Sequence, residues 1–210
     1  MYLTPVIEKA FSENKHRFIG SNSHSAIIRR LGMSFEFPKD LKFRVEKFKD
    51  IDSNEFTVSG LFDMTTNKKY VILNVAEVDD ELNLNEDTYE QFKFLVSQTI
   101  QHESIHQLQW QYREEIDDPV KLDFRNFAGT LDEEREYLSD IDEIDAYAHD
   151  IAMEIRFFYP KENPFKVLKR INRAKKIPSF LYYKNIFYKC EWHKIKKQLL
   201  SKTYKWIPHV

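Results

Sequence analysis

The 210-residue sequence predicts an α+β fold, in which long helices accompany a small sheet. Residues 88–114 place apolar side chains and a pair of histidines along one side of a helix. Residues 132–158 form a second long helical stretch, which ends before a proline. Two shorter runs, residues 55–63 and 69–75, are rich in the branched and aromatic side chains that favour strands.

Two short helices are expected at the N-terminal end of the chain. They cover residues 3–12 and 22–31, with Ser21 or Ser23 as the N-cap of the second helix and Gly32 near its end. This end has neither a basic start nor a long apolar run, so no signal peptide is expected. No segment approaches the roughly 18 apolar residues that a bilayer requires, and we expect a cytoplasmic protein without membrane contact.

A small antiparallel sheet is expected after these helices. Apolar and charged side chains alternate from Phe43 onward, which predicts a strand. The β-rich runs at residues 55–63 and 69–75 flank the turn-forming residues 65–68 and therefore predict a hairpin. Residues 79–87 are acidic and contain asparagine, so we expect a loop there.

The rest of the chain is predicted to be helical. The first long helix covers residues 88–114, with Thr88 as its N-cap, and the second covers residues 132–158. Further helices are expected at residues 165–175 and 180–201. The low content of 4 Gly agrees with helices joined by short connections.

Charge divides the chain into opposing blocks. Residues 77–154 carry 5 basic and 23 acidic side chains, a net of −18, whereas residues 155–210 carry 15 basic and 2 acidic side chains, a net of +13. We interpret residues 159–210 as a basic, aromatic, helical extension packed on a domain formed by residues 1–158. We favour attraction between the two blocks within one fold over binding of nucleic acid or of an acidic protein by the basic block.

The motif His102-Glu103-Ser104-Ile105-His106 is the strongest indication of function. Residues four apart lie on the same face of an α-helix, so both imidazoles can bind one metal ion. Glu103 can then reach a water molecule bound to that metal. Between Thr99 and Leu108 the only charged residue is Glu103, as expected of a helix buried behind its metal.

The motif and its uncharged neighbours resemble those of the zincin metallopeptidases. A third histidine shortly after the motif, with a glycine between, is the metzincin pattern and is absent. Gluzincins use an acidic residue on a later helix, and Glu143 begins a stretch that resembles the E-x-x-A pattern of small gluzincins from bacteria and their viruses. Asp142, Asp145 and His149 are alternative ligands on the same stretch.

This resemblance implies a minimal zincin-like fold, with a small antiparallel sheet beside the motif helix and a second ligand-bearing helix. It implies a zinc metallopeptidase acting on a protein or peptide substrate, with Zn²⁺ held by His102, His106 and Glu143. Glu103 is then the general base, and Tyr147 is the candidate for a second electrophile.

In the zincin fold the last strand of the sheet lies beside the cleft and can pair with an extended substrate, and residues 69–75 are the candidate for that strand or its neighbour. The alternative to the enzyme is a non-catalytic zincin-fold protein, whose basic C-terminal region binds nucleic acid or an acidic protein partner.

Overall fold

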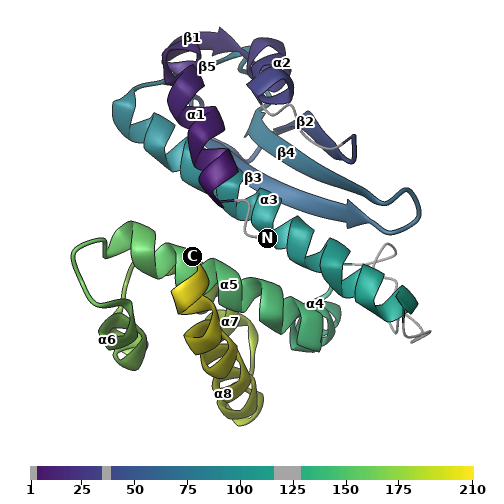
Figure 1. Cartoon of the computed structure of the whole chain (residues 1–210), viewed down its shortest axis with the longest axis vertical. Helices are drawn as coiled ribbons and strands as arrows, with labels where there is room; N and C mark the ends of the chain where they lie inside the picture. The colour runs from purple at the N-terminus through teal and green to yellow at the C-terminus, as the bar shows by residue number, and fades with distance from the viewer. Residues whose placement is uncertain (1–3, 35–38, 116–128) are drawn as a thin grey trace. The chain divides into compact units, whose positions relative to one another are not determined.

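The computed structural model describes residues 4–34, 39–115 and 129–210. The chain divides into two compact units, the first ending at Gln107 and the second beginning at Leu108. This boundary lies inside the long helix α3 (Glu86–Glu115), so α3 contributes residues to both units. Helices combined with two small sheets make the protein α+β, as predicted (Figure 1).

Unit 1 begins with α1 (Thr4–Phe18), β1 (Gly20–Ser23) and α2 (His24–Ser34). Both predicted helices are present, and both are longer than predicted. Helix α2 continues through Gly32 because one glycine inside a helix costs only about 1 kcal/mol. Of the two predicted N-caps Ser23 is the one used, since its Oγ accepts a hydrogen bond from the Ala26 amide at 3.3 Å.

The predicted loop at residues 79–87 is wrong, because it contains the strand β5 (Glu81–Leu84). Strand β5 pairs antiparallel with β1 and forms a two-stranded sheet. Leu82 and Leu84 are buried and alternate with exposed polar side chains. The alternation typical of a strand is therefore present, but it covers only four residues within an acidic stretch.

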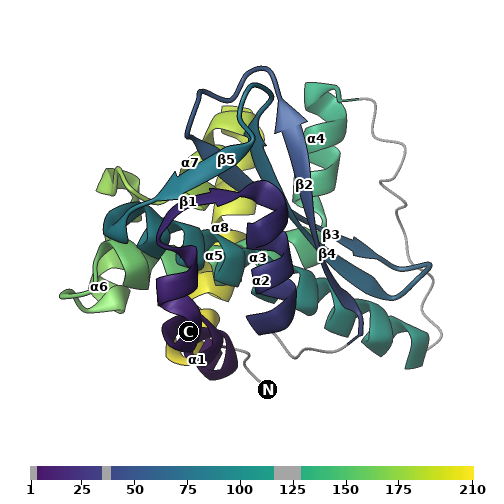
Figure 2. The ribbon, with the colours of Figure 1, turned by 90° about the horizontal axis from the view of Figure 1, so that it is seen from above.

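The second sheet contains β2 (Leu41–Phe48), β3 (Phe56–Asp63) and β4 (Lys68–Ala76), in the order β2-β4-β3 (Figure 2). All three strands and the β3–β4 hairpin were predicted. The expected purely antiparallel sheet is wrong, because β4 pairs antiparallel with β3 but parallel with β2. The hairpin folds β4 back into the centre, where it runs in the same direction as β2. Strand β4 is thus the neighbour of both edge strands.

The core of unit 1 lies between α1, β4 and the first half of α3. It includes Phe11, Val71, Leu73, Phe92 and Val96. Helix α3 begins two residues earlier than predicted because its N-cap is Asn85 and not Thr88. The Asn85 Oδ1 accepts the Thr88 amide at 2.9 Å, and the Thr88 Oγ1 accepts the Asn85 amide at 2.8 Å.

Unit 2 begins, after the C-terminal end of α3, with α4 (Leu131–Ser139) and α5 (Ile141–Phe158). The prediction of one continuous helix over residues 132–158 is wrong at Asp140. The backbone of Asp140 is extended (φ −62°, ψ 141°) and ends α4, while its side chain accepts the Asp142 amide and caps α5. An aspartate can act as an N-cap in the middle of a helical pattern, which explains the break.

The remaining chain is helical, as predicted, but in shorter pieces. The elements are α6 (Pro164–Lys169), the 3₁₀ turn η2 (Ile171–Arg173), α7 (Pro178–Ile186), α8 (Lys189–Trp206) and the 3₁₀ turn η3 (Ile207–His209). Residues 159–210 share one core with α5, in which Ile144, Ile151 and Ile155 meet Ile195 and Leu199. Within the described residues, no helix is both long and apolar enough to cross a bilayer.

Candidate metal centre

The two histidines of the motif lie on one face of α3, one turn apart, as their spacing predicts. The Nε2 atoms of His102 and His106 are 3.1 Å apart, and their ring centroids are separated by 4.8 Å. Two nitrogen ligands at about 2.0–2.1 Å from a tetrahedral zinc ion lie about 3.3 Å from each other. The two imidazoles therefore have the spacing of ligands to a single ion.

Glu103 is buried, and its carboxylate lies against the backbone of β3 at Gly60. A Cβ atom added to Gly60 would lie 2.2 Å from the Glu103 Oε1 and 2.7 Å from the Thr99 Cγ2. Gly60 pairs with Val71 of β4, whose side chain belongs to the core shared with α3. Only a glycine at this position of β3 leaves room for the carboxylate. Sequence reasoning missed Gly60, although a glycine inside a predicted strand indicates a close approach of another group.

A polar network joins the residue after His106 to the end of the sheet. The Gln107 side-chain amide donates to the Asp40 Oδ2 at 2.9 Å and to the Asn67 Oδ1 at 2.8 Å. Lys69 is buried, pairs with the Asp40 Oδ2 at 2.9 Å and donates to the Gln107 Oε1. This network fixes the motif turn of α3 to the residue before β2 and to the β3–β4 turn.

The same network sets the charge state of Asp40. Partial burial opposes ionisation of this carboxyl group, but hydrogen bonds from Lys69 and Gln107 and the positive charge of Lys69 outweigh burial. The pKa of Asp40 is therefore held below its usual range. The one feature of the sequence that indicated this network is Lys69, a charged residue at a position on the buried face of a predicted strand.

Within unit 2, the C-terminal turns of α3 bind the start of α5. The Gln109 side-chain amide donates to the Asp142 carbonyl at 3.2 Å, and Arg113 forms an ion pair with the Asp142 carboxylate. Asp142, one of the alternative metal ligands, is therefore already neutralised by a cation. These contacts hold the first turn of α5 against α3 immediately beyond the motif.

Glu143 follows in that first turn and is buried. Ala146 and Ala148 in the next turn are fully buried, and Ala146 is the alanine of the E-x-x-A pattern. Burial, and then the negative charge of Glu143, raise the pKa of the Tyr183 hydroxyl above its usual range. Glu143 belongs to unit 2 and the two histidines to unit 1, and its role as third ligand stays a prediction.

The other two alternative ligands contact α8. Asp145 pairs with Lys202 at 3.0 Å and accepts a hydrogen bond from the Trp206 indole at 3.1 Å. His149 is almost completely buried, with its ring edge-on to Trp206 at 5.0 Å between centroids. The His149 Nδ1 lies 3.8 Å from the Asp150 carboxylate and makes no hydrogen bond. Both side chains thus have structural roles between α5 and α8.

Tyr147, the predicted second electrophile, is half-buried and packs against α7. Its ring centroid lies 5.0 Å from that of Tyr183 and 6.0 Å from that of Tyr182. Tyr147 thus helps to pack α5 against α7, while its catalytic role stays a prediction.

The chain matches no protein-family model, no curated protein and no solved structure.

Proposed function

We propose that the protein is a zinc-dependent metallopeptidase that hydrolyses peptide bonds. The observation that carries the proposal is the 3.1 Å spacing of the two Nε2 atoms on α3. The carboxylate of Glu103, the residue after His102, lies against β3 at Gly60. Two histidines four residues apart on a helix, with a glutamate after the first, supply two metal ligands and a general base.

Glu143 is the third ligand in this proposal. Among the described residues, His102, His106 and Glu143 form a group whose side chains could hold one metal ion. Helix α3 supports the same assignment. Gln109 lies three residues after His106, on the same side of the helix, and it binds the residue that precedes Glu143. If these three residues held zinc, one coordination position would be left for water.

Two imidazoles and one carboxylate form a donor set that suits zinc. When bound, zinc supplies Lewis acidity and lowers the pKa of water toward about 7. Glu103 then accepts the proton as water attacks the scissile carbonyl, and it delivers that proton to the leaving amine. In the same proposal Tyr147 donates a hydrogen bond to the developing oxyanion.

The finer fold assignment and the location belong to the same proposal. A small sheet beside the motif helix, followed by a helix that carries Glu143, supports a minimal zincin-like fold. The substrate would be a protein or peptide, and the location would be cytoplasmic.

The test compares zinc content and cleavage of a broad peptide pool in three variants. His102→Ala and Glu143→Ala should lose stoichiometric zinc, because each removes a ligand. Glu103→Gln should keep zinc, while turnover falls by about 10²–10⁴-fold, the range expected when a general base is lost. The matched control is Glu136→Ala, which removes an exposed carboxylate on α4 and should change neither property.

Two outcomes contradict the assignment. Full zinc occupancy in His102→Ala would exclude the motif as the metal site. Loss of zinc in Glu103→Gln together with its retention in Glu143→Ala would mean that the roles of the two glutamates are reversed. If wild-type protein binds zinc but cuts no peptide in the pool, the peptidase activity itself is excluded for those sequences.

A further inference from the structure

The basic side chains of the C-terminal region are mostly not neutralised within unit 2. Arg170 pairs with Glu162, and Lys202 pairs with Asp145 at 3.0 Å. In residues 155–210, all of which the structure describes, the other basic side chains form no ion pair within this unit. Among the described residues of unit 2, the ion pair between Lys202 and Asp145 is the one that joins the acidic and basic blocks. Most of the +13 net charge faces solvent.

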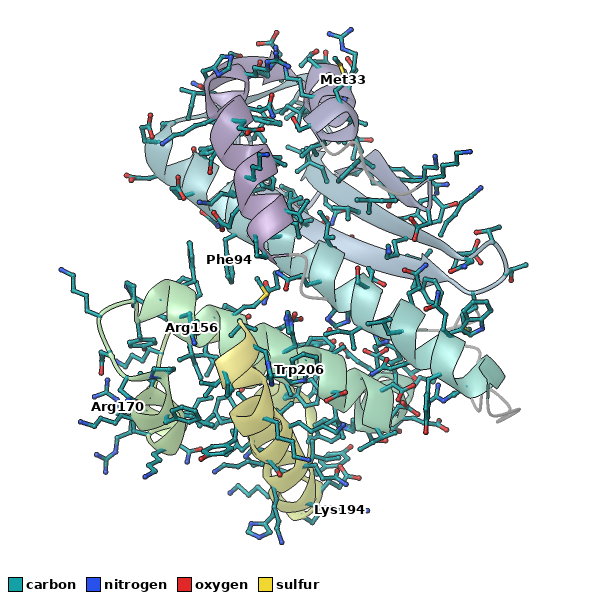
Figure 3. All side chains as sticks on the ribbon, in the orientation of Figure 1. Met33, Phe94, Arg156, Arg170, Lys194 and Trp206 are labelled. Atoms are coloured by element: carbon teal, nitrogen blue, oxygen red, sulfur yellow. The ribbon has the colours of Figure 1, made fainter. Side chains whose placement is uncertain are left out.

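Three of the six lysines of helix α8 lie on one exposed face. Its buried side, which includes Ile195 and Leu199, packs on α5. Lys194, Lys197 and Lys205 are exposed on the side away from α5. Figure 3 shows Lys194 near the N-terminal end of α8 and extending outward. The axial rise from residue 194 to residue 205 is about 16 Å.

Helix α6 extends this face sideways. The Phe165 ring lies 4.9 Å from the Tyr204 ring between centroids, so α6 runs beside the C-terminal half of α8. Lys166 and Lys169 of α6 are exposed. Tyr204 is 58% exposed, so part of this residue is open to solvent beside its contact with Phe165.

We propose that this surface binds the phosphodiester backbone of single-stranded nucleic acid. We call it the α6–α8 basic surface, and it consists of Lys166, Lys169, Lys194, Lys197, Tyr204 and Lys205. Lysines contact phosphates as point charges and do not read base edges, so binding should not depend on sequence. An aromatic ring among them provides a stacking platform for an unpaired base.

The composition of the surface favours nucleic acid over a membrane or an acidic protein. A helix that inserts into a bilayer surface needs large apolar side chains beside its lysines. The one large hydrophobic side chain exposed on α8 is the aromatic ring of Tyr204. An aromatic ring can stack on an unpaired base, whereas the carboxylates of an acidic protein surface have no group that stacks in this way.

The test is fluorescence anisotropy of the full-length protein with labelled 20-nucleotide strands of DNA and RNA and with a 20-base-pair duplex. Affinity for the single strands should fall by about 10-fold or more between 50 and 200 mM salt, because binding releases counterions. The triple variant Lys194→Glu/Lys197→Glu/Lys205→Glu should lose binding by more than 10-fold at 50 mM salt. Its matched control is Lys39→Glu/Lys42→Glu/Lys49→Glu, which changes the net charge equally on exposed residues of unit 1 and should lose much less.

Tyr204→Ala separates stacking from charge. Stacking of one base on an aromatic ring is lost in this variant, so affinity for single strands should fall by roughly 5-fold or more while affinity for the duplex changes little. The control is Tyr112→Ala, which removes a similarly exposed tyrosine from α3. Thermal unfolding of each variant shows whether loss of the contact between Tyr204 and Phe165 has destabilised unit 2.

Three results would overturn the proposal. The first is the absence of salt-sensitive binding to any strand at 50 mM salt. The second is an equal loss of binding in the two triple variants, because net charge alone would then explain it. The third is binding to phosphatidylserine vesicles, or to polyglutamate, that exceeds binding to the strands. Glu103→Gln should bind the strands like wild type, so this result and the peptidase result can fail independently.

Discussion

Gly60→Ala is the substitution whose effect on the candidate centre follows most directly from the structure. The new Cβ would lie 2.2 Å from the Glu103 Oε1, whereas carbon and oxygen atoms in contact are about 3.3 Å apart. The carboxylate must therefore move by about 1 Å or the strand must shift. No atom of the two histidines is among the three nearest to that Cβ, so the proposed metal ligands on α3 should stay in place.

The expected magnitudes differ for activity and for stability. A displacement of about 1 Å in a catalytic group can lower turnover by about 10²-fold. Gly60 itself is exposed, but the new Cβ would overlap the buried Glu103 side chain. Such overpacking costs about 1–3 kcal/mol, and the reduced backbone entropy of the unfolded chain offsets about 0.4–1 kcal/mol of that cost. We therefore expect Gly60→Ala to unfold at a temperature several degrees below that of wild type, at about 2–4 °C per kcal/mol for a chain of this length.

The assay combines thermal unfolding, zinc content and peptide cleavage, with Gly32→Ala as the control. A Cβ at Gly32 meets no atom within 4 Å, and this glycine lies inside α2, so alanine there should be neutral or stabilising. The double variant Gly60→Ala/Glu103→Ala tests the contact directly. Removing the carboxylate relieves the overlap with Glu103 but leaves the one with the Thr99 methyl group at 2.7 Å. The two substitutions should therefore be coupled by about 1 kcal/mol in unfolding free energy.

Additive effects of the two substitutions would refute the contact between Glu103 and Gly60, whatever the protein does to peptides. If the two substitutions are coupled in unfolding free energy but Gly60→Ala has wild-type turnover, the contact between Glu103 and Gly60 is supported. Glu103 would then have no role in the catalytic step. Loss of zinc in Gly60→Ala would show that the whole motif turn moves, and that the carboxylate does not move alone.

Two further variants test one carboxylate contact in each unit. Glu154→Gln should lower the unfolding free energy by about 1–3 kcal/mol, because the buried carboxylate accepts the Ser179 amide and hydroxyl at the start of α7. Urea unfolding measures this loss, and an equal effect of Glu136→Gln, in which the carboxylate is exposed, would contradict it. Asp40→Asn should be less stable than wild type at pH 7, and the difference should shrink toward pH 3. The folded-state pKa of Asp40 is depressed, so its contribution is present above its unfolded pKa of about 3.9 and is lost as the pH falls through the folded value. A difference that is constant with pH would contradict this sign.

The elements that could be predicted from sequence were those with long or regular patterns. The helix bearing His102 and His106 and the β3–β4 hairpin are present within a few residues of their predicted bounds. The predicted helix boundaries were wrong where a single capping side chain outweighed the hydrophobic periodicity. Asp140 ends α4 and caps α5, and Asn85 caps α3. A capping residue can stand inside or beside a helical pattern without changing its period.

The surroundings of the motif could not be predicted because they depend on strand order. Gly60 faces Glu103 only because β3 pairs with β4 on the side away from β2. This strand order could not be predicted, because the sequence was also compatible with a purely antiparallel sheet. Asp40 and Lys69 meet Gln107 only because β2 and β4 run parallel with Leu41 opposite Lys69. Side chains that come together through a mixed sheet share no spacing along the chain.

Zinc binding should stabilise the folded protein if the proposed ligands are correct. A ligand that binds only the native state adds RT ln(1 + [L]/Kd), about 2.7 kcal/mol at a hundredfold excess over Kd. The midpoint of thermal unfolding should then rise by about 5–10 °C when zinc is added to the chelator-treated protein. Glu103→Gln should keep this rise, since the base is not a ligand, whereas His106→Ala and Glu143→Ala should lose most of it. Because His106 belongs to unit 1 and Glu143 to unit 2, an ion held by both would also make the two units unfold together. A rise that survives in Glu143→Ala would exclude Glu143 as a ligand and leave zinc bound within unit 1 alone.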